Sequence, residues 1–256
     1  MTAYVGGKGG VIGKQIANVI TELNHDNLPV WDVTCGMCGV LRHIRAPKRY
    51  ASDIHSDLIT MWQKLQRNWL PPINVSFEEY MELKNNPYAD PALRTYVGFA
   101  FGYCGVFMGS FKPRFQIHHD VDPATGLSLT GVRAFRGVQN ALNSLRDVRF
   151  LSGSYDEMTD QIPELRQHQP MCIYADPPYK HSVKKIGSRT TTSFDFDKFW
   201  NWVRNMSAQH LVIVSEREAP PDFIKIWSKP RTLRMNNRFA NRTKTKMDEC
   251  LFVCGH

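Results

Sequence analysis

The sequence predicts an α/β fold built on a parallel sheet, with a second, mixed segment inserted into it. Three observations indicate this fold. Short apolar runs alternate with stretches of helical periodicity near both ends of the chain; the first runs end in a glycine turn and in an aspartate; and between about residues 67 and 146 proline-rich stretches replace the alternation. A chain of 256 residues, 42% of them hydrophobic, can bury the core of such a domain.

The expected elements follow from two periodicities. Apolar residues three to four positions apart predict helices over 11–23, 58–65 and 195–206. Apolar runs bounded by turn residues predict strands over 28–33, 49–53, 148–151, 171–175 and 211–215, and a buried terminal strand around 251–253. A strand, a glycine turn, a helix and a second strand ending in Asp53 form the opening unit of a nucleotide-type parallel sheet. We therefore expect a sheet domain in 1–66 and 147–256, divided by an insert in 67–146.

The charge of the chain suggests a polyanionic partner. The net charge is +8 and the pI is about 9.2. The stretch 229–246 is rich in Lys and Arg and has no acidic residue, and further basic residues follow Tyr179 and occur in the insert among phenylalanines. A run of charge is commonly a solvated face, so contact with nucleic-acid phosphates is one of two interpretations.

Cysteine usage and hydropathy indicate the compartment. The six cysteines are expected to be free thiols in a reducing environment. Cys35 and Cys38, and Cys250 and Cys254, have spacings that could hold zinc, but the second pair flanks an apolar strand, so we expect no metal. No N-terminal apolar segment and no apolar run near 18 residues occur, which predicts a cytoplasmic protein without membrane contact.

The glycine-rich stretch at 4–14 invites comparison with a phosphate-binding loop. That loop needs a glycine where Lys8 stands and a Ser or Thr where Gln15 stands. The lysine-first variant of the loop also fails, because Val11 and Ile12 occupy the place of one residue. We therefore do not expect an ATPase, and the glycine turn is expected to serve another ligand or to pack against another part of the chain.

The stretch Asp176-Pro177-Pro178-Tyr179 carries the clearest chemistry. It follows the apolar run 171–175, and binding sites in open parallel sheets lie at that end of a strand. The Asp176 carboxylate and the Pro177 carbonyl can accept the two N–H groups of a planar exocyclic amine, which frees the nitrogen lone pair for attack. Pro178 keeps the turn rigid, and Tyr179 offers a face on which a base can stack. The alternative is a proline turn with Asp as a cap.

These residues and their order resemble the Dam-type (D12 class, alpha group) DNA adenine-N6 methyltransferases over most of the chain. The matching stretches are Tyr4 to Gly9, Asp32 to Gly39, Ala51 to Ile54, Phe101 to Phe107, Phe150 to Met158 and Asp176 to Tyr179. The short remainder of the chain after Tyr179 leaves the insert before the catalytic motif, which is the alpha order. The resemblance implies a Rossmann-like S-adenosylmethionine-dependent methyltransferase sheet with a mostly helical target-recognition insert that contains a β-hairpin at about 99–116.

The resemblance also implies the reaction and its residues. A methyl group passes from S-adenosylmethionine to adenine N6 of double-stranded DNA, with the base flipped out of the duplex, S-adenosylhomocysteine as product, no metal and a monomeric enzyme. The catalytic residues are Asp176, Pro177, Pro178 and Tyr179. The cofactor contacts are Tyr4, Gly6, Gly7, Lys8, Asp32, Cys35, Gly36, Gly39, Asp53, Ile54, Ser154, Tyr155 and Asp176. With the basic clusters, the DNA contacts are Lys112, Arg114, Arg133, Arg136, Lys180, Lys184, Lys185, Arg238 and Arg242.

Within the cofactor set, the resemblance assigns particular roles. Lys8 lies near the methionine moiety, Asp53 binds the ribose hydroxyls, and Tyr155 lies by the adenine ring. The alternative for Asp53 is the N-cap of the helix that starts near Ser56.

Three positions depart from the family pattern. Thr34 replaces an aromatic residue, Cys38 replaces the second glycine of the turn, and Cys104 replaces an Asn of the insert. The recognition sequence, for which the family favours GATC, therefore stays open. So do the other acceptors that the motif serves, which are cytosine N4 and amines of RNA or protein, and the possibility of an inactive DNA-binding relative.

Overall fold

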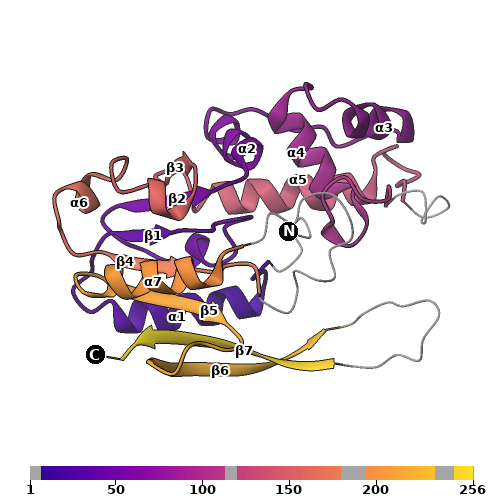
Figure 1. Cartoon of the computed structure of the whole chain (residues 1–256). Helices are drawn as coiled ribbons and strands as arrows, with labels where there is room; N and C mark the ends of the chain where they lie inside the picture. The colour runs from indigo at the N-terminus through magenta and orange to yellow at the C-terminus, as the bar shows by residue number, and fades with distance from the viewer. Residues whose placement is uncertain (1–6, 113–119, 180–193, 234–244, 256) are drawn as a thin grey trace.

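The computed structural model describes residues 7–112, 120–179, 194–233 and 245–255 and confirms the predicted α/β fold (Figure 1). One seven-stranded sheet has the order β3-β2-β1-β4-β5-β7-β6. The strands are β1 (Val30–Asp32), β2 (Arg49–Asp53), β3 (Arg149–Ser152), β4 (Cys172–Ala175), β5 (Leu211–Glu216), β6 (Phe223–Leu233) and β7 (Thr245–Cys254). β7 runs antiparallel to both its neighbours, and the other pairs are parallel.

The helices fall into the sheet domain and the insert. In the sheet domain they are α1 (Val11–Leu23), η1 (Leu41–His43), α2 (Ser56–Gln66), η4 (Tyr155–Glu157), α6 (Pro163–Arg166) and α7 (Phe196–Ser207). In the insert they are α3 (Phe77–Asn85), α4 (Pro91–Ala100), η2 (Tyr103–Gly105) and α5 (Leu129–Leu142). In the sheet domain, each predicted helix and strand is present, most of them with boundaries shifted by at most a few residues, and the terminal strand begins earlier than expected, at Thr245.

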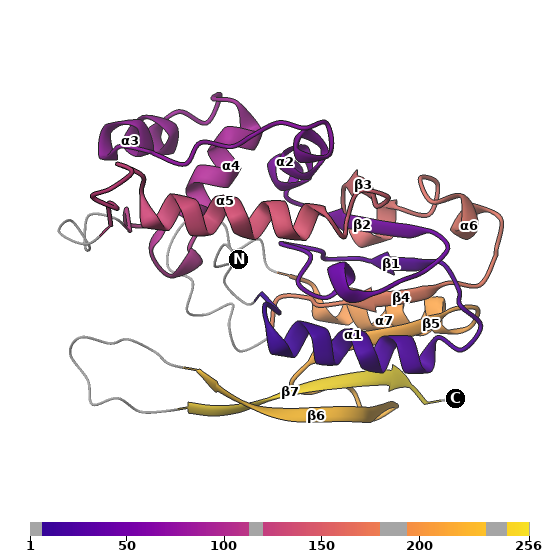
Figure 2. The same ribbon diagram turned by 180° about the vertical axis from the view of Figure 1, so that it is seen from behind.

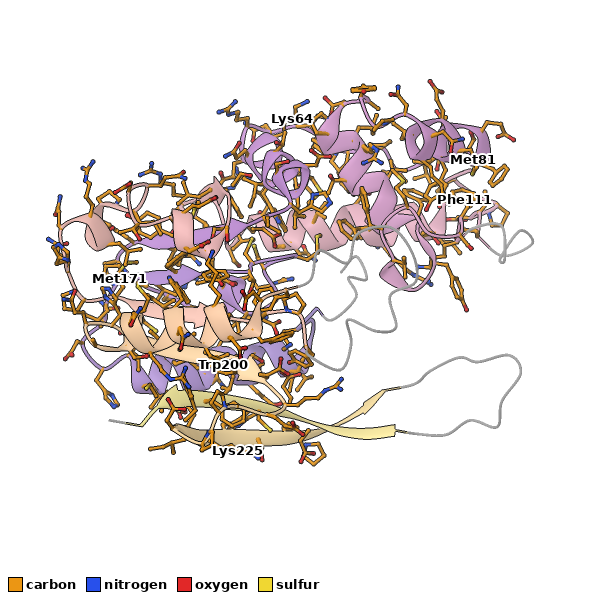
Figure 3. The ribbon with its side chains drawn as sticks, viewed as in Figure 1. Lys64, Met81, Phe111, Met171, Trp200 and Lys225 are labelled. Atoms are coloured by element: carbon orange, nitrogen blue, oxygen red, sulfur yellow. The ribbon has the colours of Figure 1, made fainter. Side chains whose placement is uncertain are left out.

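The strands are buried on both sides because successive side chains pack into two different hydrophobic cores. In β4, Cys172 and Tyr174 belong to the core beneath α1 and α2, whereas Ile173 and Ala175 belong to the core beneath α7. Figure 1 shows α7 in front of the sheet, and Figure 2, seen from behind, shows α1 in front. Trp200 of α7 lies on the face of the sheet that α7 covers, and Met171 lies at the amino end of β4 (Figure 3). This two-sided burial explains why these strands read as continuous apolar runs.

The strand order reverses between β1 and β4. β1 leads outward to β2 and β3, and β4 leads in the other direction to β5. Because the strands β1 to β5 are parallel, their carboxyl ends meet along one edge of the sheet. A ligand site is expected at the reversal, outside those carboxyl ends.

The insert shares a core with the sheet domain. Tyr80, Tyr96 and Phe101 are buried in the same cluster as Val30 and Tyr174 of the sheet. Figure 1 shows α3, α4 and α5 gathered on the side of α2, and Figure 3 shows Met81 and Phe111 together within that group.

The expected β-hairpin at about 99–116 has a different form in the described part of the insert. Residues up to Ala100 belong to α4, and a single antiparallel bridge joins Gly102 to Phe111 around η2. Residues 113–116 lie outside the described residues. Phe111 is 7% exposed and packs against Tyr80, with ring centroids 5.0 Å apart, so this aromatic residue is part of the core. The glycines of the turn allow the chain to fold this tightly, since a Cβ on Gly102 would lie 2.3 Å from the Gly98 carbonyl oxygen.

A small polar cluster of Lys48, Tyr50 and Glu164 lies at the amino end of β2. Lys48 Nζ donates to Glu164 Oε1 at 2.7 Å, and the Tyr50 hydroxyl donates to Glu164 Oε2 at 2.6 Å. Glu164 is buried, whereas the Lys48 side chain is 61% exposed. No helix in the described ranges is long and apolar enough to span a bilayer.

Candidate functional site

Four strands bring predicted site residues to one edge of the sheet. Asp32 ends β1 and Asp53 ends β2, while Ser154 and Tyr155 follow β3 and Asp176 follows β4. The first four positions lie on the cofactor side of the predicted site, and Asp176 lies across the strand reversal from β2 and β3. The sheet therefore places the predicted cofactor and catalytic residues side by side.

The glycine-rich stretch holds Lys8 against two backbone segments. A Cβ on Gly13 of α1 would lie 2.1 Å from the Lys8 carbonyl oxygen and 2.2 Å from that of Gly39. A Cβ on Gly39 would lie 2.7 Å from the same Lys8 oxygen. Only glycine permits this approach, so the two glycines fix the backbone of Lys8 between α1 and the turn after β1. This close packing is the structural use of the glycine turn at 7–14.

The side chain of Lys8 contacts Asp176 and Tyr179 of the predicted catalytic stretch. Its Nζ donates to Asp176 Oδ1 at 2.7 Å and to the Tyr179 hydroxyl at 2.6 Å, and it lies 3.3 Å from Glu249 Oε1. The residue is 4% exposed. A buried ammonium needs charged partners, and here two carboxylates from different strands supply them.

Tyr179 links Lys8 to Glu249 of β7. The Tyr179 hydroxyl accepts from Lys8 and donates to Glu249 Oε1, which also accepts from Ser215 Oγ at 2.7 Å. Burial first, and then the negative charges of Asp176 and Glu249, raise the pKa of Tyr179 far above its usual range, so the phenol stays protonated and donates. The ring has Lys8 Nζ at 4.6 Å and Arg217 Cζ at 5.2 Å from its centroid. The expected stacking of a base on this ring stays a prediction.

The backbone of the motif is anchored by Thr34. The Asp176 N–H donates to Thr34 Oγ1 at 2.8 Å, which joins the turn after β1 to the exit of β4. Pro177 is buried and Pro178 is exposed. Thr34 therefore provides a hydroxyl acceptor for the main chain of the stretch predicted to be catalytic.

Asp53 is bound to the turn that follows β1. Its Oδ2 accepts from the Gly36 N–H at 3.0 Å and its Oδ1 accepts from the His55 N–H at 3.0 Å. The N-cap of α2 is His55, whose Nδ1 accepts from Leu58 N–H at 3.3 Å, so the alternative that Asp53 caps this helix is wrong. Burial raises the pKa of Asp53. Next to it Ile54 is 76% exposed.

The turn between Asp32 and Gly39 has two residues in the left-handed region. Gly36 has φ 48° and Cys38 has φ 51°, so Cys38 adopts the conformation of the glycine that it replaces. Trp62 Nε1 donates to the Gly36 carbonyl at 3.1 Å and fixes the turn from α2. Cys35 and Cys38 are buried, and burial raises the pKa of both thiols. Within the described ranges, no group of three or more His, Cys, Asp or Glu is arranged for a metal ion.

One carboxylate oxygen of Asp32 accepts no hydrogen bond from the described part of the chain. The residue is 3% exposed, and its Oδ1 has no hydrogen-bond partner there. Burial first, and then the charges of Asp176 and Asp53, raise the pKa of Asp32 well above its usual range. A buried carboxylate oxygen of this kind is unfavourable alone and favourable beside an N–H or ammonium group of a ligand.

Tyr155 lies in the aromatic group under α7. Its ring centroid is 4.9 Å from that of Trp202 and 5.5 Å from that of Phe199. The preceding residue, Ser154, begins η4 with a capping box to Glu157. The expected place of Tyr155 beside an adenine ring stays a prediction.

The predicted DNA contacts are divided between described and undescribed residues. Arg133 and Arg136 are exposed on α5 three residues apart, so they share one face of the helix, and Lys112 is half-buried. The remaining predicted positions lie outside the described residues: Tyr4 and Gly6 of the cofactor set, and Arg114, Lys180, Lys184, Lys185, Arg238 and Arg242 of the DNA set.

Sequence reasoning missed the partners on β5 and β7. Ser215 of β5, Arg217 directly after it and Glu249 of β7 contact Tyr179, although none of the three belongs to a motif in the sequence. A signal for Glu249 was available, since it directly precedes the apolar residues of a buried terminal strand, where an acidic side chain needs a partner.

Comparison with known proteins gives limited similarity. No protein-family model and no curated protein matches the sequence. Two solved structures of the rRNA methyltransferase aviRa from Streptomyces viridochromogenes are similar to this chain, with a TM-score of 0.37 each. The sequence identities are 9% and 10%, over 94% of this chain and 84% of that one. The function of this chain is therefore inferred from its own sheet order and site geometry.

Proposed function

We propose that the chain is an S-adenosylmethionine-dependent DNA methyltransferase that modifies adenine N6. The observation that supports this most directly is the position of Asp176 and Pro177. They leave β4 at the strand reversal, beside the carboxylates of Asp32 and Asp53 that end the first two strands. An amine acceptor and a nucleoside-containing donor would thus bind at adjacent places on one edge of the sheet.

The residues at the ends of β1 and β2 fit the cofactor. The buried Asp32 Oδ1, without a donor in the described residues, suits an ammonium or N–H group of an amino acid moiety. Asp53 keeps lone pairs on oxygens that already accept backbone N–H groups, and these can accept ribose hydroxyls. The exposed Ile54 offers an apolar surface for a purine. When bound, S-adenosylmethionine supplies an electrophilic methyl group.

The residues after β4 act on the acceptor amine. The Asp176 carboxylate and the Pro177 carbonyl accept the two N–H groups, and this disfavours delocalisation of the lone pair into the ring. Thr34 holds the Asp176 main chain through its N–H, so the two acceptors keep a fixed orientation. The nitrogen becomes cationic as it gains the methyl group and then loses a proton readily. The chain's own task is therefore alignment, and a strong base is not needed.

The basic surface supports nucleic acid as the acceptor. Arg133 and Arg136 present two positive charges on one face of α5, and the whole chain has a net charge of +8. The choice of adenine in double-stranded DNA as the acceptor, rather than cytosine N4 or an amine of RNA, rests on the resemblance to the Dam-type family. The resemblance lies in the motif itself and in its position after the insert.

The test is methyl transfer to defined nucleic acids. We expect the purified chain, incubated with cofactor carrying a tritiated methyl group and with unmethylated duplex DNA, to label N6-methyladenine after digestion to nucleosides. Asp176→Ala should reduce labelling at least about 100-fold, because one of the two acceptors of the amine is lost, while calorimetric binding of S-adenosylhomocysteine stays measurable. Label on cytosine N4, or label only on RNA, would show that the acceptor is a different amine. A purified chain that labels none of these acceptors would reject the proposal, whether or not it binds the cofactor.

A further inference from the structure

Lys8 and the acceptor amine compete for the same carboxylate. In the structure Asp176 Oδ1 accepts from Lys8 Nζ at 2.7 Å. The proposed reaction needs the same carboxylate to accept from the amine. Its two oxygens can serve two donors, but an ammonium group on one oxygen makes the carboxylate a weaker acceptor for the other donor. Lys8 is buried, so it cannot simply give up an anionic partner and remain charged without another. A second carboxylate within reach would solve this conflict.

We propose that Glu249 is the residue that holds the Lys8 side chain in place when Asp176 turns to the acceptor amine. This makes Glu249 a positioning residue, which acts on the acceptor through Lys8 and Asp176, and the inference depends on the amine-methylating function proposed above. Glu249 Oε1 is already 3.3 Å from Lys8 Nζ, and its side chain is 2% exposed. Lys8 therefore has to move little to exchange one carboxylate for the other.

The position of Glu249 is fixed from a neighbouring strand. Ser215 Oγ of β5 donates to Glu249 Oε1 at 2.7 Å, and β5 pairs with β7 through Ser215 opposite Leu251. The Tyr179 hydroxyl also donates to the same oxygen while it accepts from Lys8. Glu249 and Tyr179 thus form a second set of partners for Lys8 that does not include Asp176.

The chain contains a matched cluster that has no such task. Glu164 binds Lys48 and Tyr50 at the amino end of β2, with the same three residue types. Lys48 is exposed to solvent, and Glu164 lies at the end of the sheet away from the strand reversal. Loss of charge at Glu164 should therefore affect stability and leave acceptor binding unchanged.

The first experiment compares Glu249→Gln with Glu164→Gln. With Glu249 neutral, Asp176 is the remaining carboxylate that pairs with Lys8, so Lys8 should hold it more firmly against the amine. We expect kcat/KM for the duplex to fall about 10- to 100-fold in Glu249→Gln, with the dissociation constant for S-adenosylhomocysteine within a factor of about two of wild type. Glu164→Gln should keep the kcat/KM of wild type.

A double-mutant cycle tests the route through Lys8. If Glu249 acts through Lys8, then Lys8→Met and Glu249→Gln are not additive, and the double variant should lose no more kcat/KM than the worse single variant. A Glu249→Gln enzyme with the kcat/KM of wild type, or losses that multiply in the double variant, would overturn the inference. An inactive wild type that still binds the cofactor would reject the proposed function itself, and this inference with it.

Folding is checked separately. Should Glu249→Gln fail to give a cooperative thermal transition, Ser215→Ala serves in its place, because it removes a donor that fixes Glu249 and leaves both charges. We expect a smaller fall in kcat/KM, about 3- to 10-fold, with unchanged cofactor affinity. No fall in this variant would count against Glu249 as the positioning residue.

Discussion

Gly13→Ala should destabilise the chain, although it replaces glycine by alanine inside a helix. In an isolated helix this change is worth about 1 kcal/mol in favour of folding. Here the new Cβ would lie 2.1 Å from the Lys8 carbonyl oxygen and 2.2 Å from that of Gly39. Both atoms belong to the backbone, so α1 or the segments around it must shift, and such overpacking costs about 1–3 kcal/mol or more.

The clash at Gly13 involves two segments at once, so we expect the upper end of that range and a net loss of about 2 kcal/mol in the free energy of unfolding. For a chain of this size, that corresponds to a fall of about 4–8 °C in the midpoint of thermal unfolding. Calorimetry or circular dichroism measures it. Asn18→Ala, an exposed position of the same helix, is the matched control and should raise the midpoint slightly.

The same substitution should also affect the site. Lys8 reaches Asp176 only because its backbone is held by the two glycines, and displacement of that backbone would move the Nζ away from both carboxylates. We expect kcat/KM to fall more than the stability change alone explains under conditions where Gly13→Ala is still folded. A variant as stable as Asn18→Ala would refute the close approach of Lys8 to α1.

Two further predictions concern the turn after β1. Thr34→Val removes the acceptor of the Asp176 N–H and should lower kcat about tenfold. Thr34→Ser keeps the hydroxyl and should keep the kcat of wild type. Equal activity of the two variants in a methyl-transfer assay would contradict the anchoring role of Thr34. Asp32→Asn should raise the thermal midpoint at neutral pH while weakening S-adenosylhomocysteine binding in calorimetry. Burial raises the pKa of Asp32, so its folded-state contribution is favourable below the unfolded pKa and is lost as the pH rises through the folded pKa. The stabilisation by Asn should therefore shrink as the pH falls towards the unfolded pKa of about 4, and a gain independent of pH would contradict a raised pKa of Asp32 in the folded chain.

The sheet was predictable because its signals are local. The strand at 49–53 and the helix at 11–23 have the predicted boundaries, since an apolar run or a helical period determines each of them within a few residues of sequence. Asp53 and Asp176 could be placed for a similar reason, because each follows a recognisable strand, and the carboxyl ends of parallel strands meet.

Contacts between distant segments could not be predicted in the same way. Glu249 meets Lys8 only after β7 has paired with β5, and no spacing in the sequence expresses that pairing. The N-cap of α2 is His55, although histidine ordinarily ranks below aspartate as an N-cap residue. The Asp53 carboxylate, the other candidate for this cap, accepts from the Gly36 N–H. In the insert, Phe111 is part of the core, and among the residues described between 99 and 112 a single bridge stands where a hairpin was expected.

The contact between the insert and α2 limits how new specificities could be evolved or engineered. The His55 ring, which lies at the start of α2 two residues after Asp53, meets Phe107 edge-on with centroids 5.1 Å apart and lies 6.2 Å from Phe99. A chimera that exchanged residues 67–146 as a cassette would remove both rings and leave His55 and the strand end beside it unsupported. Transplants would have to carry the matching surface of α2. Substitution of exposed positions such as Arg133 and Arg136 is therefore the more practical way to vary the proposed DNA contacts.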